Sequence, residues 1–345
     1  MARIVLADDG IVFDGDTPKE RPLGGVESSV VNLARALAAR GHEMMVRNMC
    51  ETAKVIDGVD WAPLASGLPE TADLYIANRG DKLIALMPRA RRTIFWIHNP
   101  ARYLMKWRYL SKLWRHAPAI IFIGDYHATT YPTWAPGGER IVIPYGIAPE
   151  FMAVARRDAP PGRRAIFTSN PLRSLDWLLD LWVSRIRPRV ADAEFHLFSG
   201  AATYGLVGDA KAAPMGAVLA KAKSLASAGV VVRDPVAKPR LIEEFLSARV
   251  MLYKGDLNET FCLAVGEAQA AGVPAVVGRV GSVVERVIDG ETGTIAEDDE
   301  MFADAAVRLL TDDTLWRRCH EVALLRQRRW GWDEAARAFE ELIPS

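Results

Sequence analysis

Residues 250–278 constrain the fold more than any other stretch, because they have the pattern of one complete strand–helix–strand unit. The apolar runs Val250–Tyr253 and Ala275–Gly278 each predict a buried strand. Between them a helix is expected to begin near Phe261, after capping side chains, and to stop at Gly272. Such units join parallel strands, so the sequence predicts an open parallel sheet covered by helices.

Two glutamates and the helix start make this unit a candidate ligand site. Glu259 follows the first strand, at the carboxyl edge of the sheet where α/β folds bind ligands, and Glu267 lies about two turns further on. A carboxylate beside free backbone amides suits a polyhydroxylated, phosphorylated ligand. A capping glutamate and a surface glutamate are the alternative. The amides concerned belong to Thr260, Phe261, Cys262 and Leu263.

Length and charge limit the class of protein. The chain has 345 residues, which favours two domains, and 43 basic against 43 acidic residues. A zero net charge argues against a bulk nucleic-acid binder. The cysteines Cys50, Cys262 and Cys319 have no paired or metal-type spacing, and no apolar run reaches 18 residues. We therefore expect a cytoplasmic protein without a metal, a cofactor or a nucleic-acid partner.

The first half of the chain also alternates short apolar runs with helical segments, which predicts a second parallel sheet. The turn after its first strand, Ala7–Val12, lacks the G-x-G-x-x-G fingerprint of dinucleotide-binding enzymes. Gly25 opens a helix where the lack of a side chain would let a ligand approach, although a simple glycine turn explains it equally well. His98 directly follows the strand 93–97, so it is placed for a ligand contact or for capping the loop backbone.

One long run resembles a known family. Glu259-x7-Glu267 is followed by Ala-x-Ala-Ala-Gly-Val-Pro, then by Gly281-Ser-Val-Val-Glu285, then by Asp289-Gly-x-Thr-Gly293. This run resembles the C-terminal signature of retaining glycosyltransferases of the GT4-type family. The resemblance implies the GT-B fold, two Rossmann-like doubly wound domains facing each other across a cleft. The expected domains are 1–148 on the acceptor side, 149–328 for the nucleotide sugar, and a C-terminal helix in 329–345 that crosses back to the first domain.

The resemblance also implies a function. A sugar, expected to be a hexose, would move with retention from a UDP- or GDP-sugar to the hydroxyl of a glycan or lipid-linked acceptor, in glycan, polysaccharide or glycolipid synthesis. The leaving diphosphate itself would help to deprotonate the acceptor. A nucleotide-sugar epimerase or hydrolase on the same fold, and a non-catalytic nucleotide-sugar-binding subunit, stay open as alternatives.

Site roles follow from the same resemblance. His98, Arg173 and Glu259 are the expected catalytic residues: a polar contact near the reaction centre, a cation for the diphosphate, and a contact to sugar hydroxyls. Glu267 would bind the ribose, and Gly25 and the amides of residues 260–263 would approach the donor. The family's second basic residue is missing, since Thr168-Ser169 stands in its place. Lys238 and Lys254 are the candidate substitutes, and Pro235 and Val236 are expected near the base.

Residues 101–116 predict a basic amphipathic helix. At helical spacing Tyr103, Trp107, Leu110 and Trp114 share one face, and several arginines and lysines lie on the other. An ordinary helix packed on the sheet is one interpretation. A contact with an acidic acceptor or with the inner membrane surface is the other, and it would make the enzyme peripheral.

Overall fold

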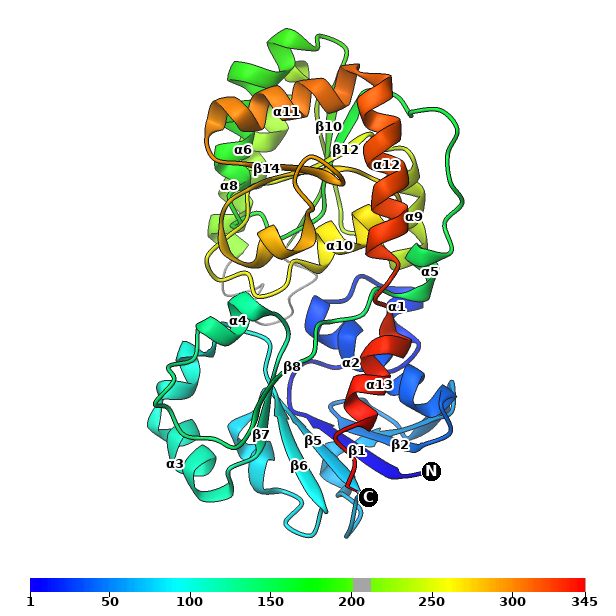
Figure 1. The fold of residues 1–345 in the computed structure, drawn as a ribbon, viewed down its shortest axis with the longest axis vertical. Coiled ribbons are helices and arrows are strands. Elements are labelled where there is room, and N and C mark those ends of the chain that lie inside the picture. Colours follow the sequence, from blue (N-terminus) through cyan, green and yellow to red (C-terminus); the bar gives the residue numbers. More distant parts are fainter. Residues whose placement is uncertain (201–211, 345) are drawn as a thin grey trace. The chain divides into compact units, whose positions relative to one another are not determined.

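The structure, a computed structural model, describes residues 1–200 and 212–344, and the chain folds into two compact units. Unit 1 comprises Met1–Pro18, Gly25–Gly146 and the chain from Trp330 onward. Unit 2 comprises Lys19–Gly24 and Ile147–Arg329. Each unit is a sheet of mainly parallel strands with helices on both of its faces (Figure 1).

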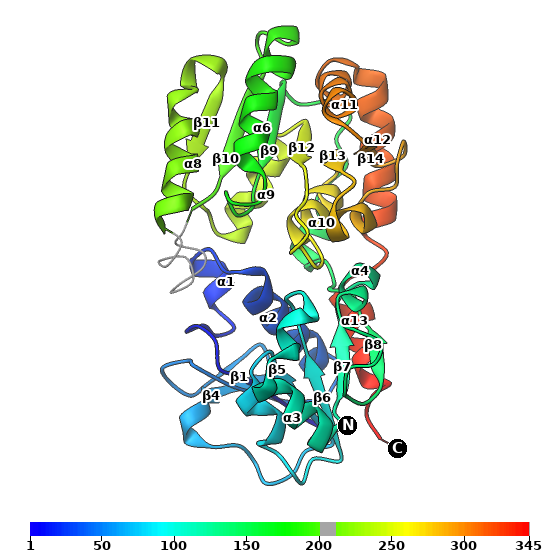
Figure 2. The same cartoon turned by 90° about the vertical axis from the view of Figure 1, so that its left-hand side faces the viewer.

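Unit 1 contains a sheet with the strand order β3-β4-β2-β1-β5-β6-β7-β8, in which β3 is antiparallel to β4 and the other pairings are parallel. Figures 1 and 2 show α2 and α13 on one side of this sheet and α3 on the other. The strands are β1 (Arg3–Asp8), β2 (Glu43–Asn48), β3 (Lys54–Ile56), β4 (Val59–Pro63), β5 (Leu74–Asn78), β6 (Arg92–Trp96), β7 (Ala119–Phe122) and β8 (Arg140–Val142). The helices are α1 (Thr17–Glu20), α2 (Gly25–Ala39), α3 (Trp107–His116), α4 (Asp125–Thr129) and α13 (Trp332–Glu340), with 3-10 turns η1 (Leu64–Ser66), η2 (Asp81–Ala85) and η3 (Ala101–Met105).

The C-terminal helix α13 packs on α2 inside unit 1. Phe339 places its ring 5.4 Å from that of Trp96, and the Arg40 guanidinium of the segment after α2 pairs with Glu340 at 2.6 Å and with Asp333 at 2.8 Å. Apolar burial therefore fixes this helix, and the exposed ion pairs add little to its stability.

Unit 2 contains a parallel sheet with the strand order β11-β10-β9-β12-β13-β14. Two of its inner strands, β12 and β13, are buried along their whole length, as expected for a sheet covered on both faces. The strands are β9 (Arg164–Phe167), β10 (Glu194–Phe198), β11 (Val230–Arg233), β12 (Val250–Tyr253), β13 (Ala275–Gly278) and β14 (Gly293–Ala296). The helices are α5 (Pro149–Met152), α6 (Leu175–Leu181), α8 (Ala212–Ser224), α9 (Lys238–Leu246), α10 (Leu263–Ala270), α11 (Asp299–Thr311) and α12 (Asp313–Gln327). Shorter turns are η4 (Trp182–Ile186), η5 (Arg187–Arg189), η7 (Ala226–Ala228) and η8 (Gly281–Arg286).

Most of the predicted elements match the structure, and several differ. The helix expected from near Phe261 begins at Leu263, because Cys262 has a left-handed backbone (φ 62°) that excludes it from the helix. The segment 101–116 is not one helix, since Lys106 is extended between η3 and α3. The strands β3, β4 and β14 were not predicted. The loop expected over residues 200–215 lies mostly outside the described residues, and its last part, residues 212–215, belongs to α8.

Candidate functional site

The strand order of unit 2 locates its ligand-binding edge. Connections lead from β9 outward through β10 to β11, and from β12 outward through β13 to β14, so the order reverses between β9 and β12. In open α/β sheets, ligands bind beside the carboxyl ends of the strands at this switch point. Arg173 lies in the loop that follows β9, and Glu259 lies in the loop that follows β12. The two predicted residues therefore come from the two strands that flank the switch point.

Arg173 and Glu259 form an ion pair in which the arginine donates to Glu259 Oε2. The Tyr253 hydroxyl, at the end of β12, donates to the same oxygen at 2.5 Å. Burial, together with the charge of Glu259, raises the pKa of Tyr253 well above its usual range, so this hydroxyl keeps its proton. Arg173 is 34% exposed and Glu259 is 7% exposed, so a ligand can reach the cation while the carboxylate stays anchored beneath it.

Lys238 and Glu267 form a second ion pair. Lys238 opens α9, Glu267 lies inside α10, and the ammonium nitrogen is 2.6 and 2.7 Å from the two carboxylate oxygens. Burial raises the pKa of Glu267, and Lys238 opposes part of that rise. The lysine is 24% exposed and the glutamate 4%, so this pair repeats the arrangement of a reachable cation over a buried acid.

The start of α10 adds backbone donors to the same loop. Cys262 is the residue before the helix, and the first helical hydrogen bond runs from the Gly266 amide to its carbonyl. By helix geometry the amides of Leu263 and Ala264 have no partner within the helix, so they can receive negative charge. Burial and the nearby Glu259 raise the pKa of the Cys262 thiol well above its usual range, which excludes a reactive thiolate there.

The other predicted residues of unit 2 take different places. Thr260 and Phe261 are buried, and both are engaged within the protein. Their amides were expected inside the first helical turn, and the later start of α10 removes them from it. Lys254 places its ammonium 4.0 Å from the centre of the Trp177 ring, a cation–π contact. Of the two substitute cations predicted from the sequence, Lys238 is thus the one that the structure joins to a predicted acid.

Unit 1 has its own polar cluster at the carboxyl ends of β1, β5 and β6, and His98 belongs to it. Asn78 donates to Asp8 Oδ2 at 2.5 Å, so its carbonyl oxygen accepts from His98 Nε2 at 2.5 Å. The other ring nitrogen, Nδ1, then accepts from the Tyr145 hydroxyl at 2.5 Å. Burial and the charge of Arg79 lower the pKa of His98 well below its usual range, so the ring is neutral. Both ring nitrogens are occupied within unit 1.

Arg79 closes this cluster. Its guanidinium makes two bonds of 2.9 Å to the buried carboxylate of Asp8 and one of 2.8 Å to Glu27 of α2. Both acids are almost fully buried, so the arginine neutralises charges that water cannot reach. Arg79 itself has a left-handed backbone (φ 54°). Gly25, predicted to face the donor, is the first residue of α2 and is exposed.

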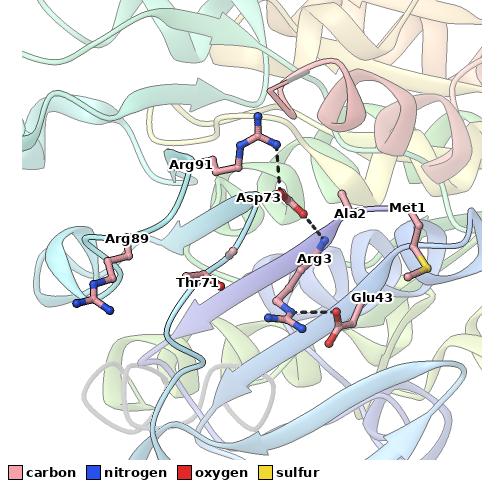
Figure 3. A pocket seen from close by; sticks show the side chains of 9 residues that line it. Met1, Ala2, Arg3, Glu43, Thr71, Asp73, Arg89 and Arg91 are labelled. Carbon is pink, nitrogen blue, oxygen red and sulfur yellow. Dashed lines mark hydrogen bonds and ion pairs between the residues drawn. The ribbon is translucent and has the colours of Figure 1, made fainter.

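A hollow of about 420 Å³ lies at the amino ends of β1, β2, β5 and β6, the opposite edge of the unit 1 sheet. Figure 3 shows that Arg3 reaches Glu43 and that Asp73 lies between Arg91 and the Arg3 backbone, while Arg89 extends away from them. This hollow contains none of the predicted site residues. Among the described residues, no group of His, Cys, Asp and Glu side chains has the arrangement of a metal site.

Sequence reasoning missed Tyr253, Asp8, Asn78 and Arg79. Tyr253 was assigned to the end of a buried strand, and Asn78 was left just outside a strand predicted to end at residue 77. The polar atoms of both side chains bond into the clusters that follow those strands. The usable signal was a hydroxyl or amide side chain at the last position of an otherwise apolar strand, since that position lies at the ligand-binding edge.

The sequence has relatives among characterised families. Residues 164–312 match the family described as Glycosyl transferases group 1. The D-inositol 3-phosphate glycosyltransferase of Streptomyces bingchenggensis is 30% identical over 223 residues, which are 58% of this chain and 49% of that protein. The enzyme of the same name from Xylanimonas cellulosilytica is 38% identical over 111 residues, 32% of this chain and 26% of that protein. The chain thus spans about half, or less, of the length of the curated relatives it matches.

Solved structures resemble the whole chain. Sucrose-phosphate synthase from Thermosynechococcus elongatus has a TM-score of 0.75 at 15% identity, covering 99% of this chain and 98% of that one. Anabaena HepE, solved in complex with UDP-glucose, has a TM-score of 0.70 at 14% identity and covers 99% of both chains. At this identity the likeness concerns the fold, and it confirms the predicted GT-B class of two parallel-sheet α/β domains.

The family match coincides with most of unit 2 and contains Arg173, Lys238, Glu259 and Glu267. The resemblance recognised from the 259–293 run is therefore confirmed: residues 164–312 match the family described as Glycosyl transferases group 1.

Proposed function

We propose that this chain is a retaining glycosyltransferase that moves a sugar from a nucleoside-diphosphate sugar to an acceptor hydroxyl, in glycan, polysaccharide or glycolipid synthesis. The observation that carries the proposal is the Arg173–Glu259 pair at the switch point of unit 2. The complex of HepE with UDP-glucose supports a nucleotide-sugar donor, since HepE shares the fold.

The arrangement suits a charged leaving group. When the donor binds, its diphosphate takes Arg173 as a partner, and the amides of Leu263 and Ala264 stabilise the charge that develops as the sugar leaves. Glu259 then loses Arg173 as its partner but keeps the hydrogen bond from Tyr253, so its carboxylate can accept hydrogen bonds from sugar hydroxyls. Glu267 accepts from the ribose hydroxyls, and Lys238 offsets part of the rise in the pKa of Glu267 that its burial causes.

The acceptor proton goes to the departing diphosphate on the same face of the sugar, which retains the anomeric configuration. His98 remains our proposal for a polar contact with the sugar, supported by its place at the carboxyl end of β6. Because both of its ring nitrogens are bonded, that contact requires the Tyr145 hydroxyl to give up Nδ1. Gly25 remains our proposal for a close approach to the donor.

The test is a melting-temperature series with UDP, GDP, ADP and dTDP at millimolar concentration. A ligand at a hundred times its Kd stabilises the folded state by about 2.7 kcal/mol. For a unit of this size that is a rise of roughly 5 to 10 °C. A rise with one diphosphate names the donor class, and acceptor-dependent release of that diphosphate then establishes transfer. No rise with any of the four would refute a donor site at Arg173 and Glu259.

A further inference from the structure

Helix α3 turns its aromatic face outward. The residues that pack it into the core of unit 1 are Tyr109 and Leu113. Trp107 and Trp114, seven residues apart and therefore on one side of the helix, are 75% and 79% exposed. As in the interpretation of an ordinary packed helix, α3 contacts the core, but it does so through Tyr109 and Leu113 and leaves both tryptophans outside that contact. The helix lies on the outer side of unit 1 (Figures 1 and 2).

Burial usually stabilises tryptophan side chains, and these two are exposed to water. A partner that covers this face would therefore be stabilised by burying them. Leu110 lies between them on the same side and is half-buried. Elsewhere on α3 apolar burial is complete, because Tyr109 and Leu113 are 6% and 0% exposed. The indoles therefore do not reflect a poorly packed helix; they form a separate surface, here called the indole face.

Exposed cations border the indole face. At 100° per residue Arg108 and Arg115 lie on one flank of α3, and Lys106 directly precedes Trp107 at the start of the helix. Arg108 shares Asp81 with Lys112, whereas Lys106 and Arg115 form no ion pair with any described residue. Asp81 packs against α3 and pairs with Lys112, which lies on the side of the helix away from the indoles. The indole face thus carries net positive charge.

We propose that the indole face docks unit 1 on the headgroup region of an anionic lipid bilayer. Tryptophan prefers this zone because its ring is apolar and its N–H is polar, and flanking lysine and arginine side chains can reach lipid phosphates. A bilayer is deformable and can adapt to an exposed helix face with two separated indoles. A protein groove would need a preformed shape that matches this face. Among the described residues no helix has the length and apolar character needed to cross a membrane, so the contact is with the surface.

The proposal is independent of glycosyl transfer, so binding alone tests it. Full-length protein is sedimented with vesicles of equal parts phosphatidylglycerol and phosphatidylcholine, and with vesicles of phosphatidylcholine alone, at low and high salt. Wild type should bind the anionic vesicles at low salt and release at high salt. Trp107→Ser/Trp114→Ser should lower the partition coefficient at least about ten-fold. Lys106→Gln/Arg115→Gln should lower it about 25-fold, at about five-fold per charge.

The matched control is Arg317→Gln/Leu325→Ser, which removes an exposed cation and an exposed apolar side chain from α12 of unit 2 and should leave binding unchanged. All substituted side chains are exposed, so the melting temperature should stay within a degree or two. Absence of wild-type binding to anionic vesicles at low salt would overturn the proposal, as would wild-type binding by both α3 variants. Binding to dextran sulfate without binding to vesicles would assign the surface to an acidic polymer, and it too would overturn the proposal.

Discussion

The two polar clusters at the carboxyl ends of the two sheets differ in how far they are closed. In unit 1 the chain from Tyr145 through His98 and Asn78 to Asp8 is buried, and each polar atom in it bonds to another. In unit 2 each buried acid is paired with a cation that solvent reaches, Arg173 or Lys238. A closed network holds a shape, whereas a pair with one accessible member can exchange partners when a ligand arrives.

Removing Arg79 should have the largest effect and should be confined to stability. Arg79→Met leaves the buried carboxylates of Asp8 and Glu27 without a cation, which should lower the free energy of unfolding by about 3–5 kcal/mol. Urea unfolding measures this change. Arg92→Met, which removes an exposed pair with Glu139, should cost less than about 1 kcal/mol. If Arg79→Met abolished the response to the nucleoside diphosphate while remaining as stable as wild type, Arg79 would act in ligand binding and not in stabilising unit 1.

Removing Arg173 should affect function more than folding. Arg173→Met deletes the cation proposed for the leaving diphosphate, and kcat/KM should fall on the order of a hundred- to a thousand-fold. The melting-temperature response to the diphosphate should fall with it. The melting temperature without ligand should fall less than in Arg79→Met, because Arg173 is more exposed and pairs with one buried acid instead of two. Arg279→Met is the control, since Arg279 is an exposed arginine of unit 2 paired with Glu297. Wild-type kinetics in Arg173→Met would remove the central residue of the proposed site.

Local spacing sufficed to place the candidate residues on their helices and loops, whereas the contacts that depend on distant packing were missed. Glu259 and Glu267 are eight residues apart and flank one helix start, so local pattern sufficed. The bond between Lys238 and Glu267 joins α9 to α10 and depends on tertiary packing that no local pattern encodes. For α3, helical spacing identified the aromatic stripe, but its direction was decided by Tyr109 and Leu113, which fit the core of unit 1.

The closed cluster of unit 1 also predicts a loss of stability in acid. His127 is buried near it, and its ring donates to the Asn99 carbonyl and accepts from the Ile123 amide. Burial lowers the pKa of His127 from 6.5 to about 4. As the pH falls between these values, the unfolded chain binds a proton that the folded chain does not, so the free energy of unfolding should fall by up to about 3 kcal/mol.

Urea unfolding between pH 7 and pH 4 measures this dependence. His127→Gln should start from a lower stability, because a buried hydrogen bond is disturbed, and should lose less of it in acid. His116→Gln, on the exposed end of α3, should keep the wild-type pH dependence. The same slope in His127→Gln as in wild type would show that other buried groups cause the acid sensitivity.

Replacing Glu267 should have the smallest effect and should separate binding from chemistry in unit 2. Glu267→Gln keeps the shape but weakens the acceptor proposed for ribose hydroxyls, so KM for the donor should rise about ten-fold with little change in kcat. Because burial raises the pKa of Glu267 above its ordinary value of 4.5, wild type should lose donor affinity in acid at a higher pH than an ordinary glutamate would require. Titration calorimetry from pH 7.5 to pH 5 measures this loss, which Glu267→Gln should lack and Glu297→Gln, on the surface, should keep. An acid-sensitive donor affinity that persists in Glu267→Gln would show that Glu267 is only the structural partner of Lys238.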